Sequence, residues 1–263
     1  MNSIRPYIAV LHQQFLNSFA KMMAFRVSMI IAASVEISVF LTFYLTANFL
    51  FNHIDTIGTW RRPEFMFFTF WYLMVMSTHN AFLAPNFWNF SMEIRTGNLD
   101  FRLLRPLGSL FDVFTAIQRP TSIMMLPIHI GFLIYYGAQA HLTGLSWTLL
   151  LPLLLLSFSL VALVEMAIAM TVFWTKGGEG LNFIRMQSQQ FQRWPDFMFP
   201  DGIRRFFSSV IPILIALSFP VRFALNNTEW RGVLATALAS IIFWFVVRLM
   251  WREGLKRYES ASS

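Results

Sequence analysis

Long apolar runs separated by short polar connections constrain the fold of this chain more than any other feature. The runs at 27–51, 65–83, 113–136, 147–174 and 233–251 approach or exceed the roughly 20 residues that a helix needs to cross a bilayer. Only 13% of all residues are charged, whereas soluble domains carry about 25%. Helices satisfy their own backbone hydrogen bonds in lipid, and the runs lack the alternation of barrel strands. We therefore expect an all-α integral membrane protein with one transmembrane domain over residues 1–263.

Residues 176–226 allow two routes, and each gives a bundle of six transmembrane helices. In the first route, 176–205 is a cytoplasmic loop and 206–225 is the fifth span. Local basic charge favours this route, because cytoplasmic loops are rich in lysine and arginine. The charge comes from Arg193, Arg204 and Arg205.

In the second route, 180–194 is a short, polar fifth span and 195–226 is a re-entrant pair of helices on the outer side. Pro212 and Pro220 favour this route, since they break the apolar run into pieces too short to span.

The distribution of lysine and arginine predicts the orientation. Both ends of the chain and residues 91–108 are basic, whereas the connection at 137–146 carries no lysine or arginine. We therefore expect both termini and 91–108 on the cytoplasmic side. The net charge of +7 is explained by basic residues that flank spans, so we expect the lipid bilayer and no nucleic acid as a partner.

The first residues predict a helix that lies in the membrane interface. Within 4–23, apolar residues recur three or four positions apart, and polar residues occupy the other faces. This spacing is typical of an amphipathic interfacial helix.

The most polar segment between runs is 91–108, SMEIRTGNLDFRLLRPLG. Its centre predicts a turn at Gly97, since glycine tolerates positive φ, and the flanks predict two short amphipathic pieces. We interpret the segment as the surface on which a soluble protein docks; the alternative is an ordinary solvated loop. Its charged residues are Glu93, Arg95, Asp100, Arg102 and Arg105.

Three ordered motifs resemble one known family. They are EIRTGNLD at 93–100 with LRP at 104–106, the pairs WP, FP, IP and FP between 194 and 220, and GLKRYESA at 254–261. Together they resemble the bacterial ABC type-2 transporter permeases, which are six-helix subunits. The resemblance covers nearly the whole chain.

This resemblance implies an exporter subunit in the bacterial cytoplasmic (inner) membrane. Such a permease pairs with a second one, identical or related, and the pair carries two cytoplasmic ATPase subunits that bind ATP-Mg. It also implies that 4–23 is an interfacial connecting helix and that 195–226 is the outer re-entrant hairpin, which favours the second route. The residues implied at or beside the ATPase contact are Glu93, Arg95, Gly97, Asp100, Arg102 and Arg105.

The fifth span departs from a typical span because it is unusually polar. It carries two arginines and four glutamines between 185 and 193. We expect these side chains to face a partner permease or a wet path.

Ionisable residues at membrane depth are the remaining candidates. An acid there costs about 2.5–3.5 kcal/mol on insertion scales, so it usually faces the bundle interior. We expect these residues to line the transport path or to contact a second permease; the alternative is an acid that only hydrogen-bonds to a neighbouring helix. For the arginine, outer headgroups are favoured, since arginine snorkels near span ends. The residues are Glu36, His79, Glu165 and Arg222.

Motifs for catalysis are absent from the sequence. It has no GxxxxGK[ST], the P-loop motif that binds the phosphates and magnesium of a nucleotide, and it has no cysteine. The five histidines are scattered, so we expect no metal site. We expect this chain to be no enzyme and to bind no cofactor itself. A channel or scaffold subunit without an ATPase, and a polytopic membrane enzyme, are the alternatives.

Overall fold

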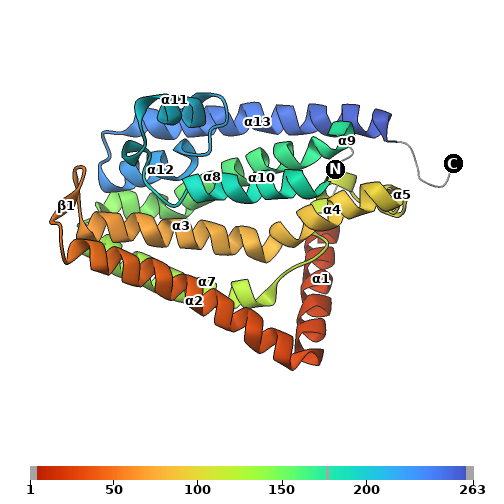
Figure 1. The fold of residues 1–263 in the computed structure, drawn as a ribbon, viewed down its shortest axis with the longest axis horizontal. Helices are drawn as coiled ribbons and strands as arrows, with labels where there is room; N and C mark the ends of the chain where they lie inside the picture. Colours follow the sequence, from red (N-terminus) through yellow and green to blue (C-terminus); the bar gives the residue numbers. More distant parts are fainter. Residues whose placement is uncertain (1–4, 176–177, 259–263) are drawn as a thin grey trace.

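The computed structural model describes residues 5–175 and 178–258, and five long helices run side by side along its long axis (Figure 1). They are α2 (Arg26–Phe51), α3 (Arg62–Phe82), α7 (Pro120–Gln139), α8 (Gly144–Met170) and α13 (Trp230–Arg257). Within these ranges, four segments are long and apolar enough to cross a membrane: α2, α7, α13 and Gly144–Thr175, which joins α8 to α9 (Val172–Thr175). The architecture is that of an all-α membrane protein, as the apolar runs predict.

A few of the sequence-based expectations fall outside the described residues. They are residue 4 of the expected interfacial helix, residues 176–177 of the region with two routes, and residues 259–261 of the C-terminal motif.

Helix α3 lies at the centre of the bundle. Every residue from Phe65 to Trp71 is buried, because this stretch is apolar or aromatic on all sides of the helix. The Phe70 ring stacks on Phe132 of α7 at a centroid distance of 4.7 Å, and Trp71 Nε1 donates to Ser157 Oγ of α8 at 3.0 Å. Aromatic packing therefore fixes α3 between α7 and α8.

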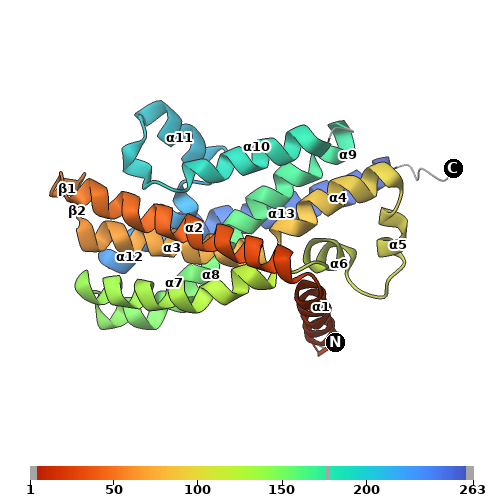
Figure 2. The same cartoon turned by 60° about the horizontal axis from the view of Figure 1, so that its bottom comes forward.

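The two ends of the bundle carry different short elements (Figures 1 and 2). At the end where both termini lie are α4 (Ala84–Thr96), α5 (Leu99–Leu103), α6 (Ser109–Thr115) and α9. At the other end are the hairpin of β1 (Thr56–Ile57) and β2 (Trp60–Arg61), the 3-10 turn η1 (Asp196–Met198), α11 (Asp201–Ser209) and α12 (Ile215–Leu225). Segment 91–108 therefore lies a bundle length away from 195–226.

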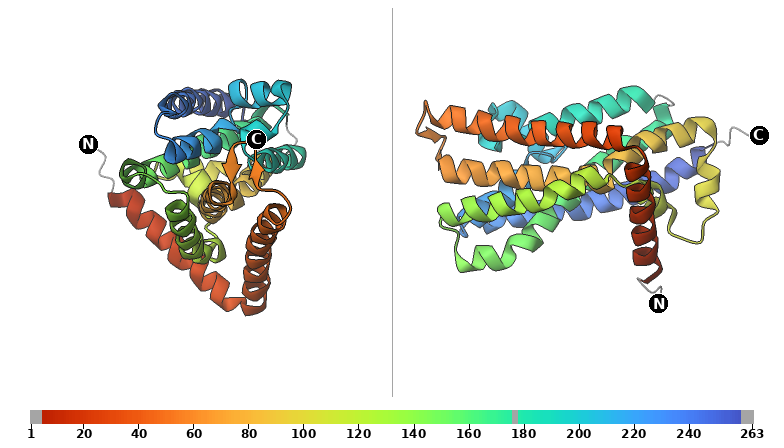
Figure 3. Two further views of the ribbon diagram at one scale, coloured as in Figure 1. Left: turned by 90° about the vertical axis from the view of Figure 1, so that its left-hand side faces the viewer. Right: turned by 90° about the horizontal axis from the view of Figure 1, so that it is seen from below.

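Helix α1 (Arg5–Ala24) crosses the end of the bundle at a steep angle to α2, as Figure 3 shows. Phe25 interrupts the helix between them, with φ of −109° and ψ of 65°. No residue of α1 is buried, and Ile8, Leu16 and Phe19 expose apolar side chains. These bounds agree with the amphipathic helix expected over 4–23.

The third span is shorter at its start than the sequence analysis predicted. Residues 113–115 belong to α6, and α7 begins only at Pro120 and continues to Gln139. Arg119 is extended, with φ of −112° and ψ of 96°, because a proline disfavours helix in the residue before it. The apolar run at 113–136 therefore contains a helix break that its hydropathy does not reveal.

Residues 206–225 do not form one helix. Helix α11 ends at Ser209 and α12 begins at Ile215, with Pro212 between them. Neither helix reaches the roughly 20 residues that cross a bilayer. Helix α10 (Gly178–Phe191) instead lies against α4 and α8 in the bundle.

Candidate functional site

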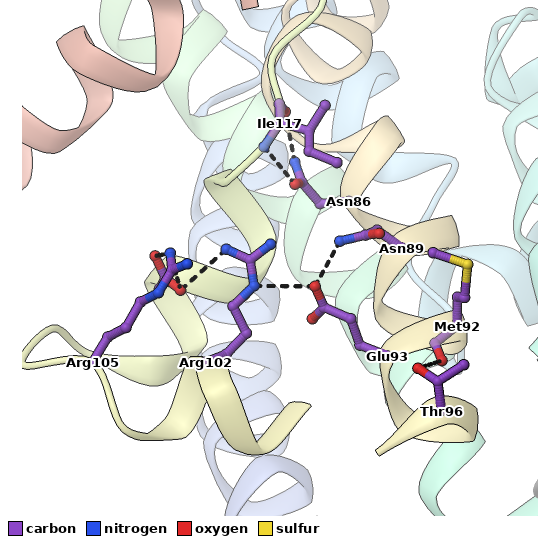
Figure 4. A network of polar contacts seen from close by, with 9 residues as sticks. Asn86, Asn89, Met92, Glu93, Thr96, Arg102, Arg105 and Ile117 are labelled. Carbon is purple, nitrogen blue, oxygen red and sulfur yellow. Dashed lines mark hydrogen bonds and ion pairs between the residues drawn. The ribbon is translucent and has the colours of Figure 1, made fainter. Parts of the chain in front are cut away.

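Glu93, the first of the two acids of segment 91–108, is buried rather than presented to solvent. Glu93 Oε1 accepts hydrogen bonds from Asn89 Nδ2 at 2.7 Å and from Arg102 Nε at 3.0 Å (Figure 4). Gly97 ends α4 with φ of 76°, a conformation that favours glycine, and this turn brings α5 back toward α4. The predicted turn thus positions Arg102 over Glu93.

A second buried acid, which the sequence analysis missed, completes this network. Asp112 in α6 is fully buried and pairs with Arg102 Nη1 at 3.4 Å and with Arg105 Nη1 at 3.1 Å. Its signal in the sequence is an acid inside the apolar SLFDVFT, shortly after a loop with more arginines than acids. Because a buried carboxylate needs a partner, this pairing holds α5 against α6.

The exposed part of segment 91–108 combines apolar and polar side chains. Phe101 is 69% exposed and Leu104 is 81% exposed, while Arg95 and Arg105 lie exposed beside them. Asp100 lies in α5 near the Tyr258 hydroxyl. The structure therefore joins Glu93, Arg102 and Arg105 in one network through Asp112, and Phe101 and Leu104 are the most exposed apolar side chains of the segment.

The connection between α6 and α7 is fastened to α4 and α1. Asn86 is fully buried and makes two hydrogen bonds with the backbone of Ile117, at 2.8 and 2.9 Å (Figure 4). Gln118 Nε2 donates to the Leu11 carbonyl of α1 at 3.2 Å. Hydrogen bonds thus hold the connection after α6 against both α4 and α1 at this end of the bundle.

Helix α10 buries polar side chains and exposes several apolar ones, together with Gln187 and Gln190. Phe183, Ile184 and Met186 are exposed. This is the reverse of a helix on a soluble protein and is expected where the surroundings are lipid. The buried side chains of α10 are polar, namely Asn182, Arg185 and Ser188, and Gln192 directly after the helix is buried as well.

Two contacts join this polar face to α4. Asn182 Nδ2 donates to Ser91 Oγ at 3.3 Å, and the Arg185 guanidinium lies over the Phe87 ring at 4.6 Å. Ser91 and Phe87 stand on the same helix as Glu93. The loop network and α10 are therefore in direct contact through α4.

Beyond Phe87, α10 reaches a fully buried acid. Glu165 Oε2 of α8 accepts from Arg185 Nη1 at 2.7 Å and lies 3.0 Å from His79 Nε2 of α3, while Glu165 Oε1 accepts from Gln189 Nε2 at 2.7 Å. The side chains of His79, Glu165 and Arg185 are 0–2% exposed. Two of the candidate residues at membrane depth, His79 and Glu165, thus meet in one cluster, and Arg185 supplies its charge balance.

Glu36 lies elsewhere, in a cavity of about 170 Å³ among α2, α3, α7 and the end of α10. The cavity is also lined by Tyr72, His129, Gln189 and Arg193. Gln189 is therefore shared, since its amide nitrogen bonds Glu165 while its side chain lines the cavity.

Arg222 lies at the opposite end of the bundle from segment 91–108. Its Nη2 lies 2.6 Å from Asp196 Oδ1, so Arg222 is paired within the chain, and its contact with lipid headgroups stays a prediction. Burial raises the pKa of Asp196, and this effect outweighs the opposing charges of Arg222 and Arg204. Ser218 Oγ accepts from the Asp196 backbone amide at 3.0 Å, which fastens η1 to α12.

Within the part of the chain that the structure describes, no group of three or more histidine, aspartate and glutamate side chains is placed to hold a metal ion.

Comparison with known proteins gives one family. The model described as ABC-2 family transporter protein matches residues 37–262, which include segment 91–108, Glu165 and all of α10. Glu36 lies one residue before the matched range. No curated protein and no solved structure matches the chain. Since the family model covers most of its length, this chain belongs to the ABC-2 family of transporter proteins.

Proposed function

We propose that this chain is the membrane permease subunit of an ATP-binding cassette exporter. A partner supplies ATP hydrolysis, and membership of the ABC-2 family supports such an ATPase partner. In the complete transporter, two cytoplasmic ATPase subunits bind ATP-Mg and two permeases, identical or related, enclose the path. The observation that carries this proposal is the continuous contact from segment 91–108 through α4 to the buried Glu165 cluster.

The membrane topology that fits this function has six spans. They are α2, α3, α7, α8, α10 and α13, with α11 and α12 as a re-entrant pair on the outer side. This arrangement is supported by the shortness of α11 and α12 and by their position opposite both termini (Figure 1). Both termini and 91–108 then face the cytoplasm of a bacterium, and the permease lies in the cytoplasmic membrane.

The ATPase docks on α5 and the turn before it. Phe101 and Leu104 supply an apolar centre, and exposed apolar side chains on a water-facing loop are typical of a binding site. Arg95 and Arg105 border this centre, and Gly97 sets the angle between α4 and α5. Glu93, Arg102 and Asp112 do not contact the ATPase in this arrangement; they hold α5 rigid.

Rigidity lets α5 transmit motion. When the ATPases close on ATP, they displace α5, and the pairs of Arg102 with Glu93 and Asp112 carry α4 and α6 with it. Ser91 and Phe87 then move against Asn182 and Arg185, which shifts α10 within the bundle. Such a shift of one packed helix against its neighbours is a common element of conformational switching.

Cysteine cross-linking tests the docking surface, because the chain has no cysteine of its own. Single variants Phe101→Cys and Leu104→Cys are treated in native membranes with a short bifunctional reagent, and the cross-linked protein is identified by mass spectrometry. We expect a Walker-motif ATPase on both variants.

Phe206→Cys in α11 is the matched control, since Phe206 is 46% exposed but lies at the other end of the bundle. It is expected to give no ATPase adduct. An ATPase adduct from Phe206→Cys, or none from the α5 variants, would contradict the proposal. If neither Phe101→Cys nor Leu104→Cys gave an ATPase adduct, the alternative of a channel or scaffold subunit without an ATPase would be favoured.

A further inference from the structure

The cavity near Glu36 contains two opposite charges that do not neutralise each other. Glu36 and Arg193 both line it, yet within the described residues no carboxylate lies within 4.0 Å of the Arg193 guanidinium. Arg193 instead lies over the Phe43 ring at 5.4 Å and approaches the Tyr72 hydroxyl. Glu36 accepts a hydrogen bond from Ser122 Oγ.

The surroundings of Arg193 differ from those of two other arginines, Arg185 and Arg222. Arg185 is neutralised by Glu165 at 2.7 Å, and Arg222 by Asp196 at 2.6 Å. A charge at membrane depth without a counter-charge is unfavourable, and such residues usually pair. Arg193 and Glu36 are thus available to a molecule that enters the cavity.

A third polar group points to the same conclusion independently. His129 is 2% exposed, lines the cavity, and neither of its ring nitrogens has a hydrogen-bond partner. Buried polar groups without partners are rare in native structures, so each requires an explanation. A ligand with hydrogen-bonding groups supplies one.

The surroundings of the cavity add an apolar compartment. A second cavity of about 140 Å³ shares Phe43 and Arg193 with the first and is lined by Phe65 and Trp194. Together the two cavities approach the lower end of the roughly 300–1,000 Å³ that ligand pockets occupy. Only Ala47 of α2 is buried, so the helix that borders both cavities lies on the outside of the bundle.

We propose that these two cavities bind an amphipathic zwitterion. Its cationic group lies at Glu36, its anionic group, a phosphate or carboxylate, lies at Arg193, and its apolar part lies along Phe43 and Trp194. His129 hydrogen-bonds to the polar head. The molecule is either the exported substrate, which rests on the function proposed above, or a lipid that resides in the permease.

Binding of lipids that differ only in charge tests this assignment. The purified chain in nanodiscs is titrated with lysophosphatidylethanolamine, lysophosphatidic acid and an alkylamine of the same chain length, which are zwitterionic, anionic and cationic. We expect the zwitterion to bind at least about ten-fold more tightly than either single charge, since hydrogen bonds to charged groups are the strong ones. Equal binding of all three probes would overturn the proposal.

Charge-removing variants give a reciprocal switch. Glu36→Gln is expected to bind lysophosphatidic acid more tightly than wild type does, because the repelling acid is gone. Arg193→Gln is expected to gain affinity for the alkylamine for the corresponding reason. A misfolded variant does not gain affinity for one charge type, so these gains are specific to the site; unchanged charge preference in both variants would overturn the proposal.

Matched controls remove the same charges outside the cavity. Arg204→Gln and Glu253→Gln alter exposed ion pairs, with Asp201 and Lys256, and are expected to leave all three affinities unchanged. The assay needs no ATPase, so its failure is distinguishable from failure of the exporter proposal. A second assay in vesicles that contain the ATPase distinguishes the two sources of the zwitterion. ATP lowers the occupancy of the cavities by an exported substrate but does not change their occupancy by a resident lipid, and both results support the site.

Discussion

Replacing Glu165 by glutamine tests the buried cluster most directly. The carboxylate is fully buried and contacts Arg185, Gln189 and His79 at 2.7–3.0 Å. Glutamine keeps the size and the hydrogen-bonding capacity but leaves Arg185 without a counter-charge. Breaking a buried ion pair by removing one partner costs about 3–5 kcal/mol, and we expect Glu165→Gln to lower the free energy of unfolding by this amount.

The double variant Glu165→Gln/Arg185→Met separates charge pairing from other effects. It removes both charges, and replacing a whole buried pair is often far less harmful than breaking it. We expect the double variant to lose about 2–3 kcal/mol less than the sum of the two single variants.

Equilibrium unfolding of the detergent-solubilised protein by SDS, followed by far-UV circular dichroism, measures these values. The exposed pair of Arg204 and Asp201 is the control, and breaking it is expected to change the free energy by less than about 1 kcal/mol. Strict additivity of the two single variants would refute the pairing, as would a Glu165→Gln variant as stable as wild type.

Three further predictions concern other positions. Gly254→Ala places a Cβ 2.3 Å from Phe173 Cδ2, so we expect a lower melting temperature in detergent; an unchanged value would contradict the packing of α13 on α9. Asp112→Asn leaves Arg102 and Arg105 without their shared carboxylate, and we expect faster proteolysis between residues 97 and 108, whereas protection equal to wild type would show that the pairing is unnecessary. The raised pKa of Asp196 stabilises the folded state below its ordinary value of about 3.9, and this contribution is lost as pH rises through the raised value. Asp196→Asn should lack that decline in unfolding free energy, and identical pH profiles for variant and wild type would refute it.

Helix positions were predictable from the sequence where hydropathy is a local property. The runs at 27–51, 147–174 and 233–251 correspond to long helices because their length and composition already fix a membrane-length helix. The start of α7 was missed because the apolar run continues through Pro120, and hydropathy alone does not show that a proline disfavours helix at Arg119.

The candidate site was predictable only in part, because its pairs depend on turn angles and on helix packing that the residue pattern does not specify. The charges at 93 and 102 were visible, but their pairing depends on the angle of the turn at Gly97. Arg185 was noticed for its polarity, whereas its position over Phe87 and beside Glu165 requires the packing of α10 between α4 and α8. Roles in ATPase docking and in transport stay predictions.

The buried polar side chains of α10 affect how the protein is inserted into a membrane. A helix with a central arginine enters the bilayer reluctantly, since arginine at mid-depth carries an insertion penalty of about 2.5–3.5 kcal/mol. The side chains on other helices that contact Arg185 and Asn182, namely Phe87, Ser91 and Glu165, all precede α10 in the chain. In the six-span topology proposed above, these contact partners are therefore synthesised before α10, and the counter-charge of Arg185 on α8 precedes the helix that needs it.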